Sequence, residues 1–351
     1  MDKRIPLLDA ARGLLSVGVV SYHASRYAWD PSGRAHGNMY YLWIIIHTLS
    51  VIMVPLFYWM SGFVIALTVL SSSNRNKVGL TFLARRLCRV TPLWWISILF
   101  SVCVEVVFDF KHGSLPKIPS WMDIVTNLTY LNFVLGRDSL NFPGYSLCLE
   151  VQMYVLTYVI LAVGTAIGAS GKYSPIPTLI LTSAVLCNTI SSQVDGLAWL
   201  TSSWPWFSLG YICYLRVKSQ VTSDWTLCCA ISLALKTMVT PLDRGGFTTL
   251  IAIFTVVAIS EYDLDYPIWK LGKSLHYLGV LSFPLYLLHI KFVAHGITFD
   301  KARAYLGLHP NATFFMLVLL PLLLAVAITP LMNRIDKVLM ARLFPRAVAQ
   351  A

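Results

Sequence analysis

Charged and polar side chains recur along one side of the first apolar segment of the chain. Five of them fall within one sector of about 100° of an α-helix: Asp9, Arg12, Ser16, His23 and Arg26. A charge at mid-bilayer costs about 2.5–3.5 kcal/mol, so ionisable residues here are candidates for function. The stripe must face protein or a water-filled cavity, because the rest of the helix is Leu, Val, Gly and Ala. An Arg–Asp pair that fixes helix packing, beside a hydrogen-bonded core histidine, is the structural alternative.

Arg12 and His23 lie at different depths on this helix. Their spacing of eleven residues corresponds to about 16 Å along the helix axis. Glu150 and His289 are expected near the outer ends of two later segments, at the depth of His23. A carboxylate beside two imidazoles could form a general-base site, because histidine titrates near neutrality and a carboxylate can orient it. Three separately hydrogen-bonded polar groups are the alternative.

A second cluster is purely basic and is expected on the inner side of the membrane. Residues 74–89 contain five basic residues and no acidic one. Among them, Arg85, Arg86 and Arg89 directly precede the expected third membrane segment. Because the planar guanidinium group suits phosphate geometry, the cluster could bind an anionic headgroup or a phosphorylated metabolite. Simple enrichment of positive charge on the inner side is the alternative.

Many apolar segments are needed to position these residues, and the composition provides them. The chain has 351 residues, of which 57% are hydrophobic and 12% charged, and its mean hydropathy is +0.67. Soluble domains have about 25% charged residues, so this chain cannot cover the surface of soluble domains of its length. The composition predicts an all-α, polytopic membrane protein and excludes disordered, collagen-like, coiled-coil and disulfide-scaffold classes. The net charge of +11 then records membrane topology rather than a nucleic-acid partner.

A bundle of about ten transmembrane helices is expected, because about 20 apolar residues cross the hydrocarbon layer as a helix. With the N-terminus in the cytoplasm, the inner segments carry sixteen Lys and Arg residues and the outer loops seven, which places both termini in the cytoplasm. Residues 121–136 contain Asp and Asn, and we expect an outer-surface helix or loop there. The ten segments lie near residues 8–28, 41–69, 91–110, 145–163, 177–190, 198–215, 225–241, 247–260, 275–296 and 312–333.

Residues 1–351 are expected to form one membrane domain without a separate soluble domain. No cleavage site follows the first apolar segment, so this segment is expected to remain as a helix. The seven cysteines show no CxxC pair and no histidine at zinc-ligand spacing, and we expect no metal site. The lipid bilayer is the expected surrounding, and for a bacterial host this is the cytoplasmic (inner) membrane.

Five short motifs follow one another along most of the chain. Together and in this order they resemble the motifs of the membrane-bound acyltransferase-3 family, namely LDxxRG with Arg-x10-His, SGF, RxxRxxP, WSLxxExxFY and SYxxYLxH. Tyr145 stands where the family has Trp and Met153 where it has Phe, changes that affect the acceptor pocket without removing an acid or base. The motifs of this chain are Leu8–Gly13 with His23, Ser61–Phe63, Arg86–Pro92, Ser146–Tyr154 and Ser282–His289.

The resemblance implies an enzyme that transfers an acyl group, often acetyl, to a hydroxyl of a sugar or cell-surface polysaccharide. It implies acyl-CoA, with acetyl-CoA favoured, as a donor used from the cytoplasm. It also implies a carbohydrate or lipid-linked glycan acceptor that is modified on the far side of the membrane. The residues that the resemblance brings into the site are Arg12, Arg86 and Arg89 for the donor, His23, Glu150 and His289 for catalysis, and Asp9, Tyr145, Ser146, Tyr154 and Tyr286 for substrate binding.

Our hypothesis for the reaction is that His23 removes the hydroxyl proton of the acceptor as its oxygen attacks the thioester. Glu150 or a neighbour would orient His23, and a covalent acyl-histidine is a variant. Ser61 and Ser146 are less favoured as nucleophiles, because no acid–base pair is in register with them. A transporter or flippase with a buried proton relay is the main rival, but it would be expected to show repeated halves. A structural or sensor membrane protein would need no ordered set of acid, base and arginine residues.

Overall fold

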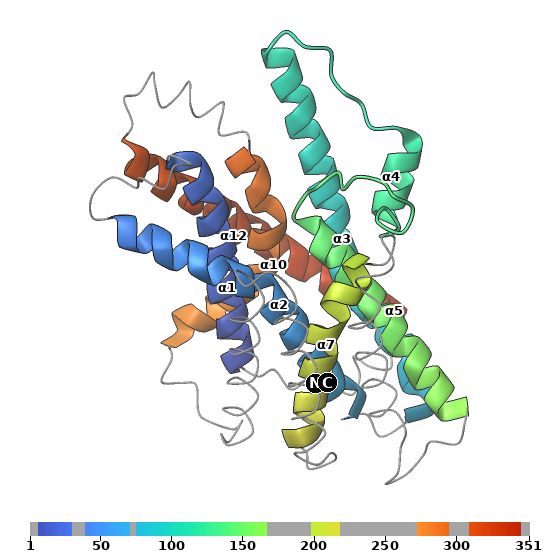
Figure 1. Ribbon diagram of the computed structural model, residues 1–351. Coiled ribbons are helices and arrows are strands. Elements are labelled where there is room, and N and C mark those ends of the chain that lie inside the picture. The colour runs from blue at the N-terminus through green and yellow to red at the C-terminus, as the bar shows by residue number, and fades with distance from the viewer. Residues whose placement is uncertain are drawn as a thin grey trace.

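All regular structure described by the computed structural model is helical. The structure describes residues 6–29, 39–70, 75–166, 198–217, 272–294 and 309–344. Within these residues there are eight helices and no strand (Figure 1). The helices are α1 (Pro6–Ala28), α2 (Tyr40–Leu70), α3 (Arg75–Lys111), α4 (Trp121–Leu128), α5 (Gly144–Ala166), α7 (Ala198–Val217), α10 (Gly272–Ala294) and α12 (Pro310–Leu343).

Long apolar helices dominate the structure and confirm a helical membrane protein. Helices α1 and α7, with 23 and 20 residues, are more polar but also long enough to cross a bilayer. The segments expected at 177–190, 225–241 and 247–260 lie outside the described residues, so a total of ten spans is not shown. The stretches that are both long and apolar enough to cross are Tyr40–Val69, Thr81–Lys111, Gly144–Val163, Leu275–Val293 and Pro310–Leu343.

The expected start of the third span, at residue 91, is wrong. Helix α3 begins at Arg75 and continues through Pro92 as one helix of 37 residues. Arginine is a good helix former, and long basic side chains can carry their charge out of the hydrocarbon layer, so the basic residues do not end the helix. Arg85, Arg86 and Arg89 therefore lie within α3 rather than in a loop before it.

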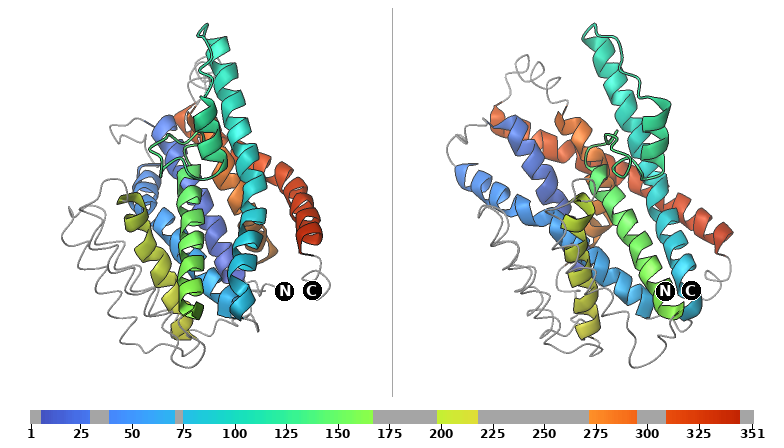
Figure 2. Two further views of the ribbon diagram at one scale, coloured as in Figure 1. Left: turned by 90° about the vertical axis from the view of Figure 1, so that its right-hand side faces the viewer. Right: turned by 45° about the vertical axis from the view of Figure 1, so that its right-hand side comes forward.

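The C-terminal part of α3 extends beyond the other helices (Figure 2). An ion pair fastens it to α10, with 2.5 Å between Lys291 Nζ and Glu105 Oε1. The Lys291 side chain is mostly buried, and a charged group in that position needs such a partner. This contact helps to fix the position of α10 in the bundle.

Helix α4 confirms the prediction of a helix or loop in residues 121–136. It has eight residues, about 12 Å, and is too short to cross a bilayer. The helix begins with a capping box in which Ser120 and Asp123 bond each other's backbone N–H groups. The hydrogen bond from the Ser120 hydroxyl lowers the pKa of the Asp123 carboxyl below its ordinary value, so the cap is charged at neutral pH.

The turns that follow α4 are mostly exposed, as a surface segment should be, but two of their asparagines are buried. Asn132 and Asn141 have no solvent exposure. The Asn141 amide donates to Ser97 Oγ on α3 at 3.0 Å and to the Leu287 carbonyl oxygen on α10 at 2.9 Å. Buried amides are normally hydrogen-bonded, and the bonds of Asn141 join the turn to two helices. The segment after α4 is therefore joined to the bundle at Asn141.

Helices α1 and α10 lie side by side and run in the same direction. A Cβ atom at Gly279 would lie 2.3 Å from the carbonyl oxygen of Asp9, so the two backbones touch there. Small residues permit such close approach between membrane helices. Farther along, the Ser16 hydroxyl donates to the Ser282 carbonyl oxygen at 3.1 Å. The two helices thus keep one register over several turns.

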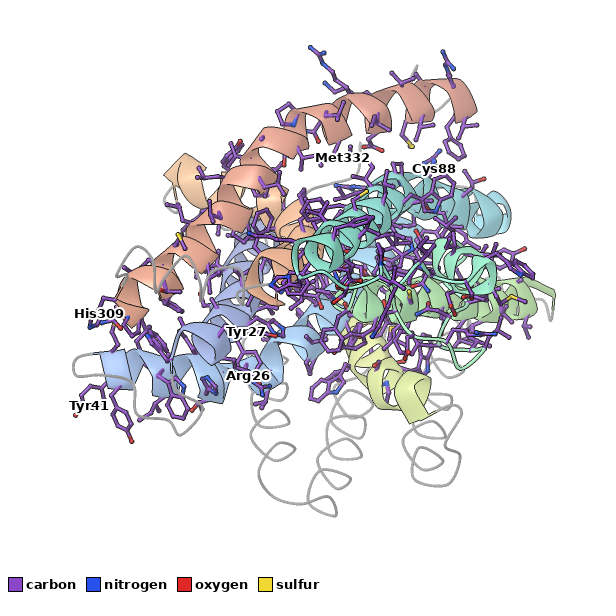
Figure 3. All side chains as sticks on the ribbon, turned by 90° about the horizontal axis from the view of Figure 1, so that it is seen from above. Arg26, Tyr27, Tyr41, Cys88, His309 and Met332 are labelled. Carbon is purple, nitrogen blue, oxygen red and sulfur yellow. The ribbon has the colours of Figure 1, made fainter. Side chains whose placement is uncertain are left out.

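Helix α12 crosses the bundle from one end to the other. Near its start, Phe314 stacks on Trp29 at the end of α1, with ring centroids 4.4 Å apart. At its other end, the Arg85 guanidinium of α3 lies 5.5 Å from the ring centroid of Phe344. Figure 3 shows this course from above, beginning at His309. The end of α1 and the start of α12 therefore meet on one side of the bundle, and the basic start of α3 lies on the other, beside the end of α12.

Two glycines bring α2 against α7. A Cβ atom at Gly62 would lie 1.9 Å from the Phe207 carbonyl oxygen, and one at Gly210 would lie 1.9 Å from the Trp59 carbonyl oxygen. Both neighbours are backbone atoms, so no side-chain rotation could make room. Gly62 is the central residue of the SGF motif, and this contact gives the motif a packing role.

Replacing Gly62 with Ala is expected to destabilise the fold by about 1–3 kcal/mol, the usual range for overpacking, because α7 must move away from α2. Thermal unfolding of the purified protein in nanodiscs would measure the change. Gly18→Ala on α1 is the matched control, because its Cβ would meet only the flexible side chain of Met53. Equal melting temperatures for the two variants would contradict this account of the α2–α7 contact.

Candidate active site

The shared register of α1 and α10 brings two histidines together inside the bundle. The ring centroids of His23 and His289 lie 5.3 Å apart, and the ring planes are inclined by 37°. His289 is completely buried and His23 is partly buried. The structure thus places side by side the two imidazoles that the sequence analysis assigns to one site.

Glu150 lies apart from this pair and is held by two hydroxyl groups. Ser61 of α2 and Tyr154 of α5 both donate to its Oε1 atom. Among the described residues, no hydrogen bond or ion pair joins Glu150 to either imidazole. The similar depths expected for His23, Glu150 and His289 predicted one common site. In the structure, however, the Glu150 carboxylate points toward α2. Glu150 is therefore placed to hold α2 and α5 together rather than to touch His23.

A hydrogen bond connects the Glu150 region with the histidine pair. The hydroxyl groups of Ser146 and Tyr286 lie 2.8 Å apart. Ser146 and Glu150 are four residues apart on α5 and share one face of that helix, while Tyr286 is three residues before His289 on α10. The polar residues from Tyr154 to the histidines therefore form a column through the bundle, with hydrogen bonds at Glu150 and at Ser146.

The arginines expected at the donor site differ in their surroundings. Arg86 is partly buried, and its Nη2 donates to Thr68 Oγ1 at 3.2 Å. Arg12 and Arg86 both lie within electrostatic range of the Tyr154 hydroxyl, at the end of the column away from His23. Arg89 is exposed on the described surface of α3. The structure places two of the three expected donor residues near the same tyrosine.

Asp9 lies far from the histidine pair. Its Oδ2 is 3.8 Å from Nδ1 of His276, at the first turns of α1 and α10. Fourteen helical residues separate Asp9 from His23, which corresponds to about 21 Å. Asp9 therefore contributes to the contact between α1 and α10 and does not line the same part of the column as Tyr286.

Tyr58 belongs to the polar column, although the sequence analysis did not select it. It is almost fully buried, and Tyr145, Tyr286 and Glu150 lie within electrostatic range of its hydroxyl. Tyr58 lies three residues before Ser61, so the two share a face of α2. The three-residue spacing from Ser61 is the feature of the sequence that could have identified Tyr58. Tyr145 also packs against the ring of Phe133, with 6.2 Å between centroids.

His47 is a second residue that the sequence analysis missed. Its Nε2 lies 3.0 Å from the Ser25 hydroxyl of α1. The ring of Tyr22 lies between the imidazoles, with centroids 5.0 Å from His47 and 5.3 Å from His23. The hydroxyl of Ser25 also donates to the Tyr22 carbonyl, so it must accept from His47. The site thus continues toward the start of α2 as a row of rings.

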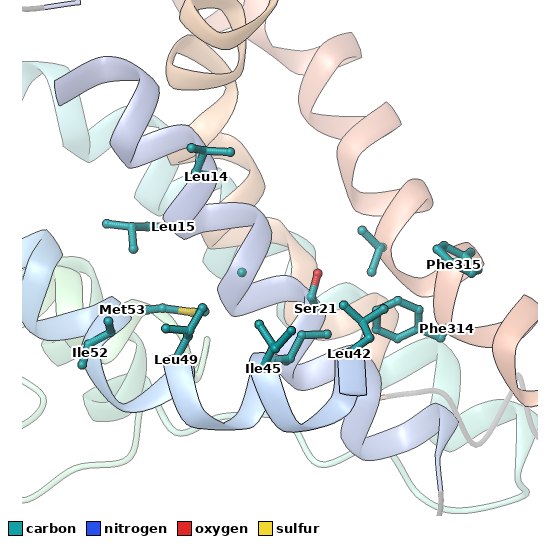
Figure 4. A pocket seen from close by; sticks show the side chains of 13 residues that line it. Leu14, Leu15, Ser21, Leu42, Ile45, Leu49, Ile52, Met53, Phe314 and Phe315 are labelled. Atoms are coloured by element: carbon teal, nitrogen blue, oxygen red, sulfur yellow. The ribbon is translucent and has the colours of Figure 1, made fainter. Parts of the chain in front are cut away.

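An apolar cavity of about 450 Å³ lies between α1, α2 and α12, on the side of α1 roughly opposite the polar stripe (Figure 4). Its lining includes Leu14, Ile45, Met53 and Phe315, and Ser21 supplies a hydroxyl group. Such a surface can accept hydrocarbon but cannot stabilise a developing charge. The chemistry therefore belongs to the polar column.

Apolar helices that enclose a column of arginine, carboxylate, hydroxyl and imidazole groups define a membrane protein with a polar intramembrane site. The model of the acyltransferase-3 family, described as an acyltransferase domain, matches residues 5–330, and the chain belongs to this family. The resemblance stated from the five motifs is thereby confirmed. The chain is thus a helical membrane protein of the acyltransferase-3 family.

A curated relative agrees with this assignment. The chain is 25% identical over 156 residues to the acyltransferase MdmB of Streptomyces mycarofaciens. The matched region covers 43% of this chain and 38% of the length of that relative. No solved structure matches the chain.

Proposed function

We propose that this acyltransferase transfers an acyl group, with acetyl favoured, from acyl-CoA to a hydroxyl group of a carbohydrate or lipid-linked glycan. The observation that carries the proposal is the polar column, which has guanidinium groups at one end and paired imidazoles at the other. Guanidinium groups suit the phosphates of a nucleotide thioester, and an imidazole suits removal of a hydroxyl proton. Binding of the donor and removal of the acceptor's proton are thus assigned to different positions along α1.

The donor end is proposed to face the cytoplasm. The complete bundle is proposed to have about ten spans with both termini in the cytoplasm, in the inner membrane of a bacterial host. The parallel course of α1 and α10 supports this topology, because both helices then cross from inside to outside. In this topology the basic residues of α3 would lie at the inner end, as the positive-inside rule favours.

Acyl-CoA is proposed to bind with its phosphates near Arg12 and Arg86. The chemistry of these side chains fits the donor, because both are cationic and lie beside the same tyrosine. When bound, acyl-CoA supplies the activated thioester. Arg89 would contribute charge from the exposed face of α3. The acceptor is proposed to lie near Tyr145, Ser146 and Tyr286, where hydroxyl groups can bond a sugar.

Replacing Arg86 with Gln is expected to raise the KM for acyl-CoA about 10- to 100-fold, because a charge-assisted hydrogen bond contributes about 1.5–3 kcal/mol. Initial rates at varied acyl-CoA concentration would measure this. Arg85→Gln is the matched control, because Arg85 is exposed and lies over Phe344. If both variants keep the KM of the unaltered protein, the basic residues serve topology alone.

The proposed function is tested with the full-length protein in nanodiscs, ¹⁴C-acetyl-CoA and a panel of soluble and lipid-linked sugars. Transfer of label to an acceptor, with release of free CoA, is the expected result. Mass spectrometry of surface glycans from cells with and without the protein would show the added acyl mass on the natural acceptor. Movement of a labelled solute across vesicles without any acyl donor, and no transfer with one, would favour a transporter instead.

A further inference from the structure

One nitrogen of the buried histidine has no hydrogen-bond partner. His289 Nδ1 lies 2.7 Å from the Tyr286 carbonyl oxygen. A carbonyl oxygen can only accept, so Nδ1 must carry a proton, and in the neutral imidazole Nε2 then carries a lone pair. Nε2 is buried and has no partner among the described residues. A buried acceptor without a hydrogen bond is energetically unfavourable, so we expect Nε2 to accept a hydrogen bond from a nearby donor.

His23 is the neighbour that can supply the donor. Its ring lies 5.3 Å from that of His289, centroid to centroid, and Tyr286 is 6.0 Å away with its hydroxyl already bonded to Ser146. His23 makes ring contacts with Tyr22 and His289, and the described part of the chain gives it no hydrogen bond. Rotation of the His23 ring about its side-chain torsions can therefore turn an N–H toward His289 without breaking another bond.

We propose that His289 is a positioning residue whose Nε2 accepts a hydrogen bond from a ring N–H of His23. The bond fixes the tautomer and orientation of His23 and leaves its other ring nitrogen free to receive a proton. This inference rests on the proposed acyl transfer. It assigns to a neutral imidazole the orienting role that the sequence analysis gave to Glu150, whose Oε1 is occupied by Ser61 and Tyr154.

The reaction then proceeds with His289 neutral throughout. The O–H bond of the acceptor breaks and its proton moves to the free nitrogen of His23. The acceptor oxygen forms a bond with the thioester carbonyl carbon, and the C–S bond breaks. The departing thiolate takes the proton from the His23 imidazolium, which gives the ester and free CoA–SH. While His23 is cationic, the lone pair of His289 Nε2 stabilises its N–H.

Two amide replacements separate this role from a structural one. In His289→Gln, the side-chain amide oxygen can reach the position of Nε2 and accept from His23. In His289→Asn, the shorter amide can still donate to the Tyr286 carbonyl but offers no acceptor at the Nε2 position. We expect His289→Asn to lower kcat about 100-fold or more, with the KM values for both substrates within about threefold, and His289→Gln to stay within about tenfold of the unaltered protein.

Thermal unfolding of both variants in nanodiscs is the control for folding. A folded His289→Asn protein with unaltered kcat would overturn the proposal, as would a folded His289→Gln protein as slow as His289→Asn. A merely structural histidine would change stability and would not distinguish the two amides in kcat.

The tautomer of His289 can be measured without an activity assay. Solid-state NMR of the full-length protein with ¹⁵N-labelled histidine would assign His289 by the signal lost in His289→Asn. A proton on Nδ1 and a coupling across an N–H···N bond to His23 are expected. A proton on Nε2 would overturn the positioning role, whatever the enzyme does. Absence of acyl transfer by the unaltered protein, with the expected NMR result, would instead reject the proposed function.

Discussion

Replacing His23 with Ala is expected to lower the rate of acyl transfer by about 10²- to 10⁴-fold, the usual contribution of a general base. His23 is the partly buried member of the imidazole pair, so it is the one that an acceptor can reach. The KM for acyl-CoA should change little, because the donor is proposed to bind at the other end of the column. Steady-state rates with labelled acyl-CoA would measure both quantities.

His112→Ala is the control for loss of an imidazole elsewhere. His112 is exposed beyond the end of α3, where its ring contacts Phe108. This variant should keep the full rate. A His23→Ala protein that inserts normally and keeps the full rate would remove His23 from the mechanism.

Replacing Glu150 with Ala is expected to reduce both the stability and the activity of the enzyme. The change leaves the Ser61 and Tyr154 hydroxyls without their acceptor, and each unsatisfied buried group costs about 1–3 kcal/mol. It also removes the carboxylate beside Tyr154, the tyrosine near which Arg12 and Arg86 lie. The yield of folded protein and its melting temperature in nanodiscs would show the loss.

Glu150→Gln separates the two effects. The amide oxygen can still accept from both hydroxyls, so this variant should retain most of the stability while it loses the charge. If Glu150→Ala is as stable as the unaltered protein, the carboxylate does not hold α2 and α5 together. If Glu150→Gln is as unstable as Glu150→Ala, the charge rather than the hydrogen bonding stabilises this part of the bundle.

The membrane helices were largely predictable, because hydropathy and length determine which segments can cross a bilayer. The start of α3 was not, because a helix can continue past the hydrocarbon layer when its side chains are long and basic. The asparagines in residues 121–136 indicated that this segment is not a span, but the hydrogen bonds of Asn141 to α3 and α10 depend on contacts that sequence spacing does not reveal.

The candidate site was predictable only in part, because sequence spacing gives the relative positions of residues on one helix but not the contacts between helices. Helical spacing places Arg12 and His23 on one face of α1, but it does not say which helix that face meets. The close contact at Gly279 sets the register of α10 and so brings His289 beside His23. Spacing gives the depth of Glu150 but not its direction, and the bond to Ser61 could not be foreseen.

A cryo-EM structure of the full-length protein in nanodiscs with a non-transferable acyl-CoA analogue tests the central claim most directly. That claim is that the donor and the acceptor chemistry occupy opposite ends of one polar column. The account predicts the analogue's phosphates within hydrogen-bond reach of Arg86 and its acyl carbonyl turned toward His23. An analogue bound without contact to Arg12 or Arg86, or with its acyl group walled off from His23, would contradict it.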